Sequence, residues 1–282
     1  MSNLKATIND LKEKEQQLNV LLEKIENDSS MIAKVYESFK VSNSLLDYSF
    51  VTNDYVDSCP KLFNIINTLI TEDLNPFKNW KLNEHRKYKA YKMDNRGTAV
   101  SNDKDVKETM IQRHLIRCKA YEEILGKMIG YEVTIPGGYK RKFPIDLISY
   151  KKDDSGLSLY LIELKKCKYG VKGSDNKEII LRAISEIATY YQVFKAAINC
   201  EDDGLAQELV DRIGEDVTID DIRKAKIYKV IIGPKKMIET KSLIENRLKL
   251  DSYKFFVIES INSNIEFSMN STEQLFKIYE VK

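Results

Sequence analysis

The sequence contains little cysteine and almost no histidine, which limits the metal sites it can build. Its 4 Cys residues lie far apart, with no C-x-x-C pair, and it has only 2 His. A structural zinc site needs closely spaced Cys and His ligands, so we do not expect one. Sparse cysteine also suits a reducing compartment, and we therefore expect a cytoplasmic protein.

Long apolar runs and an excess of one charge are missing as well. No run approaches the roughly 20 apolar residues of a membrane-spanning helix, and the N-terminus begins a charged pattern without an apolar signal segment. We therefore expect no membrane association. The 45 Lys and Arg nearly balance 43 Asp and Glu, so a polyanion would have to bind a local basic patch. No glycine-rich phosphate loop is present, so no nucleotide cofactor is expected.

The first forty residues carry a heptad pattern. Large apolar residues recur every seven positions, at Leu4, Leu11, Leu18, Ile25, Ile32 and Phe39. This pattern predicts a coiled-coil helix over about 3–40. Heptads do not identify the partner helix, which can belong to the same domain or to a second copy of the chain. The second case predicts a homo-oligomer formed through this helix.

A basic segment with interleaved aromatic residues follows at 77–96. Cations beside aromatic rings suit a phosphate backbone and exposed bases, although a solvated surface has the same composition. The candidate nucleic-acid-binding residues of this segment are Lys81, Arg86, Lys87 and Lys89. The polar stretch 97–105 has the composition of a linker, so we divide the chain into a helical N-terminal region, 1–100, and a second domain, 101–282.

The second domain alternates between helical and strand patterns. A helix is expected first, followed by three strands, a long helix, two short helices, a strand, a helix and a strand. The expected ranges are 106–129, 131–135, 143–150, 157–165, 179–198, 204–213, 218–224, 226–232, 241–248 and 254–259. This order predicts an α/β fold in which helices flank a mixed central sheet.

Charged residues interrupt two of the apolar strands. Asp146 lies inside the second strand, and Glu163 and Lys165 end the third. Because strand side chains alternate, Glu163 and Lys165 share a face while Leu164 points to the other. Pairing of the two strands would bring Asp146 beside Glu163. Buried carboxylates need partners, and oxygen ligands suit Mg²⁺ or Mn²⁺, with the Leu164 carbonyl as a further ligand. A plain ion pair between Glu163 and a lysine fits the same pattern.

The ordered set Pro144-Ile145-Asp146 and Glu163-Leu164-Lys165, on adjacent strands after a long helix, resembles the PD-(D/E)xK nuclease superfamily. The resemblance covers about 106–259 and implies a restriction-endonuclease-like core. It also implies metal-dependent hydrolysis of nucleic-acid phosphodiester bonds, in which Asp146 and Glu163 hold Mg²⁺ or Mn²⁺ and Lys165 assists the nucleophile.

Many members of this superfamily add an acidic residue from the first helix. Glu108, Glu122 and Glu123 compete for that role. On a continuous helix Glu122 falls at the edge of the apolar arc, Glu123 faces away, and Glu108 is too remote, so we choose Glu122. His114 falls inside the arc, where it is either a packed core residue or a catalytic one.

Further candidates flank these strands. Glu186 and Tyr190 stand one turn apart on the long helix, where some members carry Gln-x-x-x-Tyr. They can orient the active-site lysine, touch DNA, or make an ordinary helix contact. Basic clusters on either side of the expected metal site suit phosphate contacts. Their members are Lys140, Arg141, Lys142, Lys166 and Lys168.

The leading expectation is a metal-dependent DNA nuclease, acting as an endonuclease. A nuclease domain beside a coiled-coil arm resembles bacterial restriction and phage-defence nucleases, including the Shedu-like branch. Two alternatives use the same scaffold. One is a nucleic-acid-binding protein without turnover, and the other is a coiled-coil interaction protein.

Overall fold

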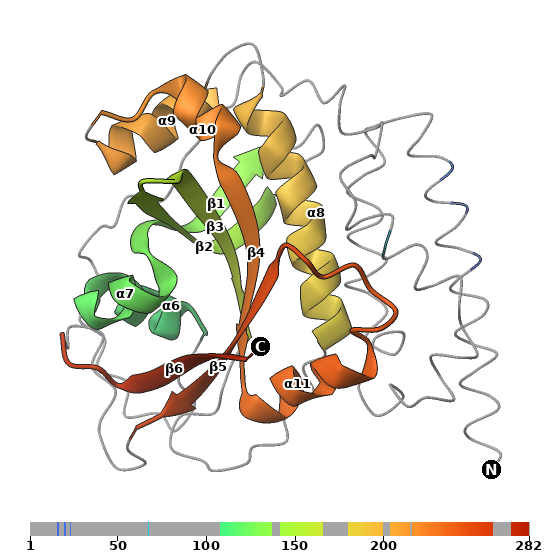
Figure 1. Cartoon of the computed structure of the whole chain (residues 1–282). Helices are drawn as coiled ribbons and strands as arrows, with labels where there is room; N and C mark the ends of the chain where they lie inside the picture. Colours follow the sequence, from blue (N-terminus) through green and yellow to red (C-terminus); the bar gives the residue numbers. More distant parts are fainter. Residues whose placement is uncertain are drawn as a thin grey trace, which may run out of the picture.

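The computed structural model places the second domain around one central sheet (Figure 1). The structure describes residues 108–136, 142–165, 180–199, 204–214, 216–261 and 272–281, with the isolated residues Gln16, Val20, Glu23 and Asn67. The predicted coiled coil, the basic aromatic segment, the linker and the domain boundary near residue 100 lie outside these ranges. Within them, no helix is both long and apolar enough to span a bilayer.

Six strands form the sheet in the spatial order β1-β2-β3-β4-β5-β6. The first three pair antiparallel, β4 and β5 extend the sheet in parallel with β3, and β6 returns antiparallel to β5. Their bounds are β1 Lys127–Pro136, β2 Lys142–Asp153, β3 Gly156–Leu164, β4 Lys226–Gly233, β5 Tyr253–Ser260 and β6 Phe276–Val281. The parallel connections need crossovers, which helices provide. The predicted mixed sheet with flanking helices is confirmed.

Helices cover both faces of this sheet. One face packs against α8, α9, α10 and α11, and the other packs against α6, the 3-10 helix η3 and α7. Figure 1 shows α8 running along the sheet on the side opposite to α6 and α7. The helices are α6 Glu108–Arg117, η3 Lys119–Tyr121, α7 Glu122–Leu125, α8 Ile180–Ile198, α9 Gly204–Ile213, α10 Ile219–Lys224, α11 Lys235–Glu239 and the 3-10 helix η4 Thr240–Leu243.

The prediction of one helix over 106–129 was wrong. Helix α6 ends at Arg117, Cys118 is extended, and β1 already begins at Lys127. The apolar residues from Ile111 to Leu125 still reach one core, which explains the helical spacing. Met128 and Ile129, however, pack on opposite faces of the sheet. Adjacent side chains point to opposite faces in a strand, so these two residues follow the period of a strand and not that of a helix.

Two further elements differ from expectation near the C-terminus. The helix expected over 241–248 lies earlier, as α11 followed by η4. Strand β6, with Phe276 and Ile278 buried and Lys277 exposed between them, was not predicted. Its alternating pattern was present in the sequence, and it pairs with β5 at the edge of the sheet.

The turn between α7 and β1 requires glycine. Gly126 adopts φ 83° and ψ 170°, a region open almost only to glycine. A Cβ there would lie 2.6 Å from the Tyr150 carbonyl oxygen. Gly214 also has a positive φ, 67°, but a Cβ would meet nothing within 4 Å.

We therefore expect Gly126→Ala to destabilise the fold more than Gly214→Ala. The backbone conformation alone costs about 1–2 kcal/mol at Gly214 and about 1–3 kcal/mol at Gly126. Forcing the Tyr150 carbonyl away adds about 1–3 kcal/mol at Gly126. Urea denaturation of both variants measures the difference in the free energy of unfolding. Equal losses would contradict the crowding inferred at this turn.

Candidate functional site

The centre of the site is the point where β2 and β3 separate. Their ladder ends at the pair Leu147 and Ile162. Beyond this pair, a side chain replaces the backbone pairing between the two strands. The backbone N–H of Leu164 donates to Oδ2 of Asp146 at 2.7 Å. Meanwhile the N–H of Lys165 donates to the carbonyl of Ile232 on β4 at 2.8 Å. A carboxylate is thereby inserted between two strands that are buried on both sides.

Lys165 joins carboxylates from two different elements. Its Nζ lies 2.7 Å from Oε1 of Glu163, at the end of β3, and 2.5 Å from Oε2 of Glu186 on α8. All three side chains are at most 7% exposed. The prediction that Glu163 and Lys165 share a face is confirmed, and Leu164 packs in the opposite layer. Glu186 was considered as a residue that orients the lysine, touches DNA or makes an ordinary helix contact. The structure contains its contact with Lys165.

The carboxylates of this cluster are hard to ionise. Burial raises the pKa of Asp146 to about 8, and the nearby charge of Glu108 adds to the effect. Burial, then the charge of Asp146, raises the pKa of Glu163 well above its usual value. Burial alone would lower the pKa of Lys165, but Glu163 and Glu186 outweigh it and raise that pKa well above the ordinary value. The cluster therefore contains one protonated lysine and more than one carboxylate. The single positive charge of the lysine cannot neutralise all of them when they are ionised.

Helix α6 contributes Gln112, which was not singled out from the sequence, and Glu108, which was considered too remote. Gln112 is buried and donates from Nε2 to Oδ1 of Asp146 at 2.9 Å. Glu108, one turn earlier on the same helix, is close enough to raise the pKa of Asp146. Glu108 and Gln112 are four residues apart and so lie on one face of the helix. This spacing points to Asp146 only when the position of the helix against β2 is known.

The structure does not bring Glu122, the residue chosen from the sequence, to this cluster. Glu122 begins α7, which is anchored along β2 by hydrogen bonds from Ser149 to the Leu125 carbonyl and from Lys151 to the Glu123 carbonyl. These contacts lie three and five residues beyond Asp146, or roughly 10 Å and more. The choice relied on a continuous helix, and the break after α6 reverses it, because Glu108 is the acidic residue next to Asp146.

Some of the remaining candidates are packed in the core, and the others lie outside the residues that the structure describes. Tyr190 is buried in the core between α8 and the sheet. His114 is fully buried, with its ring in edge contact with Tyr121 and Phe276, as expected of a core histidine. Nothing is described of the side chains of Lys140, Arg141, Lys142, Lys166 and Lys168, or of the residues Lys81, Arg86, Lys87 and Lys89.

The donor atoms at Asp146 and Glu163 fit a hard divalent cation. In the described part of the chain, Oε2 of Glu163 is buried without a hydrogen-bond partner, so one carboxylate oxygen is left for a ligand. No group of three or more His, Cys, Asp and Glu side chains in that part is arranged to hold a metal. Mg²⁺ does not need such a cage, because it is usually held by one or two carboxylates and keeps several waters.

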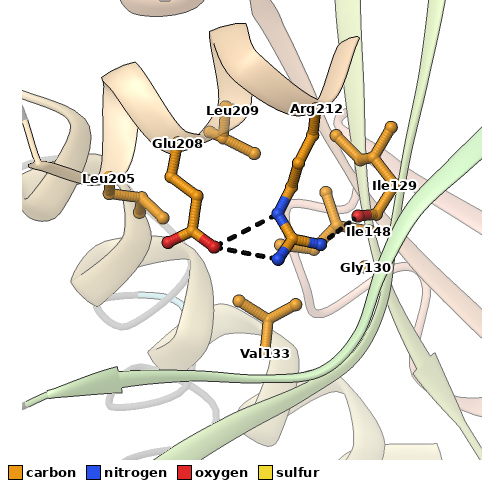
Figure 2. Close-up of a pocket in the computed structure, with 8 residues that line it drawn as sticks. All are labelled: Ile129, Gly130, Val133, Ile148, Leu205, Glu208, Leu209 and Arg212. Carbon is orange, nitrogen blue, oxygen red and sulfur yellow. Dashed lines mark hydrogen bonds and ion pairs between the residues drawn. The ribbon is translucent and has the colours of Figure 1, made fainter. Parts of the chain in front are cut away.

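A pocket of about 220 Å³, counting the space open to solvent, lies away from this cluster between α9 and β1. Figure 2 shows Arg212 reaching across it, with Nη1 donating to the Ile129 carbonyl at 2.8 Å and Nη2 bound to Glu208 at 2.9 Å. Because β1 is an edge strand, this arginine occupies one of its unpaired carbonyls. We attribute a structural role to this contact.

The raised pKa of Asp146 predicts how stability changes with pH when no divalent cation is present. The folded protein keeps a proton on Asp146 up to about pH 8, whereas the unfolded chain releases it near pH 4. The unfolding free energy should therefore fall as pH rises through this window. Asp146→Asn does not titrate, so its slope should be smaller. Urea denaturation in EDTA between pH 5 and pH 8 measures both slopes, and equal slopes would contradict the raised pKa of this carboxylate.

Comparison with known proteins does not extend these assignments. No protein-family model, curated protein or solved structure matches this chain.

Proposed function

We propose that this chain is a metal-dependent nuclease of the PD-(D/E)xK type that hydrolyses DNA phosphodiester bonds. The observation that carries the proposal is the convergence of Asp146, Glu163 and Lys165 where β2 and β3 separate. A buried group of carboxylates around one lysine is unfavourable for folding unless it binds something.

Asp146 and Glu163 would hold Mg²⁺ or Mn²⁺ in this proposal, together with the carbonyl of Leu164. Such an ion lowers the pKa of a bound water and neutralises charge that develops on the phosphodiester. The unpartnered Oε2 of Glu163 supports this role. So does the excess of carboxylates over cations in the cluster, since Glu186 and Asp146 both act on the pKa of Lys165.

Lys165 acts as a cation rather than as a base. Its pKa is held well above the ordinary value by Glu163 and Glu186, so it keeps its proton at neutral pH. A protonated lysine can donate to a phosphate oxygen or hold the attacking water in line, and its charge favours a pentacovalent phosphorus. Orienting the attacking water therefore fits Lys165 better than removing a proton from it.

The biological setting is proposed from the same resemblance. A DNA endonuclease of bacterial restriction or antiphage defence, similar to the Shedu-like branch, would use the basic clusters beside the site to hold DNA. The N-terminal helix would join two copies, so that two sites could address the two strands. A cytoplasmic location suits this role.

Labelled oligonucleotides of double-stranded DNA, single-stranded DNA and RNA test the proposal in Mg²⁺, Mn²⁺ and EDTA. We expect DNA products with either metal and none in EDTA. Cleavage of RNA alone would retain the chemistry and change the substrate. Stable DNA binding with no product under any metal would favour the alternative of a binding protein without turnover.

A further inference from the structure

Gln112 is the buried polar residue of α6 that contacts the site. Its side chain is 1% exposed, and its Nε2 donates to Oδ1 of Asp146 at 2.9 Å. The backbone N–H of Leu164 donates to Oδ2 of the same carboxylate at 2.7 Å. Each oxygen of Asp146 therefore accepts one hydrogen bond, from a helix on one side and a strand on the other. Two bonds from separate elements fix the plane of the carboxylate.

The helix that carries Gln112 is itself held firmly. Ile111 and Leu115, on the same helix, are 0% and 1% exposed in the core between α6 and the sheet. The amide nitrogen of Gln112 is thus delivered from a packed helix and not from a mobile loop.

Folding alone gives little reason for glutamine at this position. Oε1 of Gln112 is buried and has no hydrogen-bond partner among the described residues. A buried amide with an unsatisfied oxygen is unfavourable, and an apolar side chain of similar size would avoid that loss. Among the described residues, the hydrogen bond that the Gln112 side chain makes in return is the one to Asp146. Residues that break a folding rule in this way concentrate at functional sites.

We infer that Gln112 is a positioning residue that orients the Asp146 carboxylate for the divalent cation and thereby sets the affinity of the site. The inference rests on the proposed function and adds a residue outside the three that define the resemblance. Hydrogen-bonded partners of metal ligands typically change metal affinity or activity by about 10-fold to 100-fold when removed. The donor from Leu164 remains in a Gln112 variant, so the effect should be partial.

A direct Mn²⁺ titration of the full chain, by calorimetry or electron paramagnetic resonance, tests this inference without measuring cleavage. Gln112→Met keeps the volume and removes the donor. We expect its dissociation constant for Mn²⁺ to rise about 10-fold or more. The free energy of unfolding should change little, because the loss of the bond to Asp146 opposes the removal of the unsatisfied amide oxygen. Leu115→Ala is the matched control on the same helix. It should destabilise the protein and leave the Mn²⁺ affinity unchanged.

A double-mutant cycle shows whether Gln112 acts through Asp146. In the Asp146→Asn background, Gln112→Met should cause no further loss of Mn²⁺ affinity, because the carboxylate that it orients is gone. In cleavage assays of Gln112→Met, the Mn²⁺ concentration for half-maximal rate should rise by the same factor as the dissociation constant. The maximal rate at saturating Mn²⁺ should recover. A residue with a merely structural role would not produce this separation.

The outcomes separate the inference from the proposed function. Wild-type protein that binds Mn²⁺ and cleaves DNA, with Gln112→Met indistinguishable from it, would overturn the inference alone. If Gln112→Met lowered the Mn²⁺ affinity by the same factor in the Asp146→Asn background as in the wild type, the inference would also be overturned, because Gln112 would then not act through Asp146. Wild-type protein that neither binds Mn²⁺ nor cleaves would overturn both.

Discussion

Lys165→Met is expected to reduce the rate of DNA cleavage strongly and to destabilise the protein at the same time. The lysine is the cation shared by Glu163 and Glu186, and it is 6% exposed. Its removal takes away the charge that favours the transition state, which typically costs about 100-fold to 1000-fold in rate. It also leaves two buried carboxylates without their partner. Breaking a buried pair in this way costs about 3–5 kcal/mol.

The two losses should respond differently to conditions. Because Asp146 and Glu163 already have raised pKa values, lowering the pH protonates them and should restore part of the stability of Lys165→Met. The cleavage rate should stay low at every pH. Urea denaturation at pH 5 and pH 8, beside a cleavage assay in Mn²⁺, separates the two effects.

Lys229→Met is the matched control for this experiment. Lys229 is also a buried lysine, 1% exposed on β4, and its Nζ lies 3.9 Å from the centroid of the Tyr191 ring. We expect this variant to lose stability and to keep its rate per folded molecule. Loss of cleavage in both lysine variants would mean that stability alone limits the reaction, contrary to the role given to Lys165.

The second large effect is expected from Glu163→Gln, and it should differ in kind from that of Glu186→Gln. Glu163 has an unpartnered oxygen and lies beside Asp146, whereas Glu186 reaches the cluster from α8 and binds Lys165. Glu163→Gln should therefore lose cation affinity and cleavage together. Glu186→Gln should keep the affinity and lower the maximal rate about 10-fold to 100-fold, because Lys165 loses one of its two anchors.

Mn²⁺ titration and single-turnover cleavage of both variants measure these two quantities separately. The substitutions are isosteric, and both remove one negative charge from the same cluster, so each serves as the control for the other. If both variants lost cation affinity to the same degree, Glu186 would belong to the cation site. If neither did, the assignment of Glu163 as a ligand would be wrong.

The parts of the site that lie on β2 and β3 could be predicted from the sequence. Asp146, Glu163 and Lys165 stand out because charged residues interrupt apolar strands, and alternation places the last two on one face. The hairpin was predictable because a short polar stretch joins the two strands. These signals are local, so one sequence is enough to read them.

The contribution of α6 could not be predicted in the same way. The bond from Gln112 to Asp146 joins residues 34 positions apart and depends on where the helix ends and how it packs. The break at Cys118 is not visible in the spacing, because the apolar residues on both sides of it enter the same core. The choice between Glu108 and Glu122 depended on that break, so spacing alone could not show which of the two lies near Asp146.

Nicking of supercoiled plasmid by the purified full chain tests the central claim most directly. Wild type and Glu163→Gln are incubated side by side in Mn²⁺ and in EDTA, after circular dichroism has shown that both are folded. The account predicts nicked and linear DNA only for wild type in Mn²⁺. Equal nicking by Glu163→Gln, nicking in EDTA, or an intact plasmid with wild type in Mn²⁺ would contradict a metal-dependent nuclease centred on Glu163.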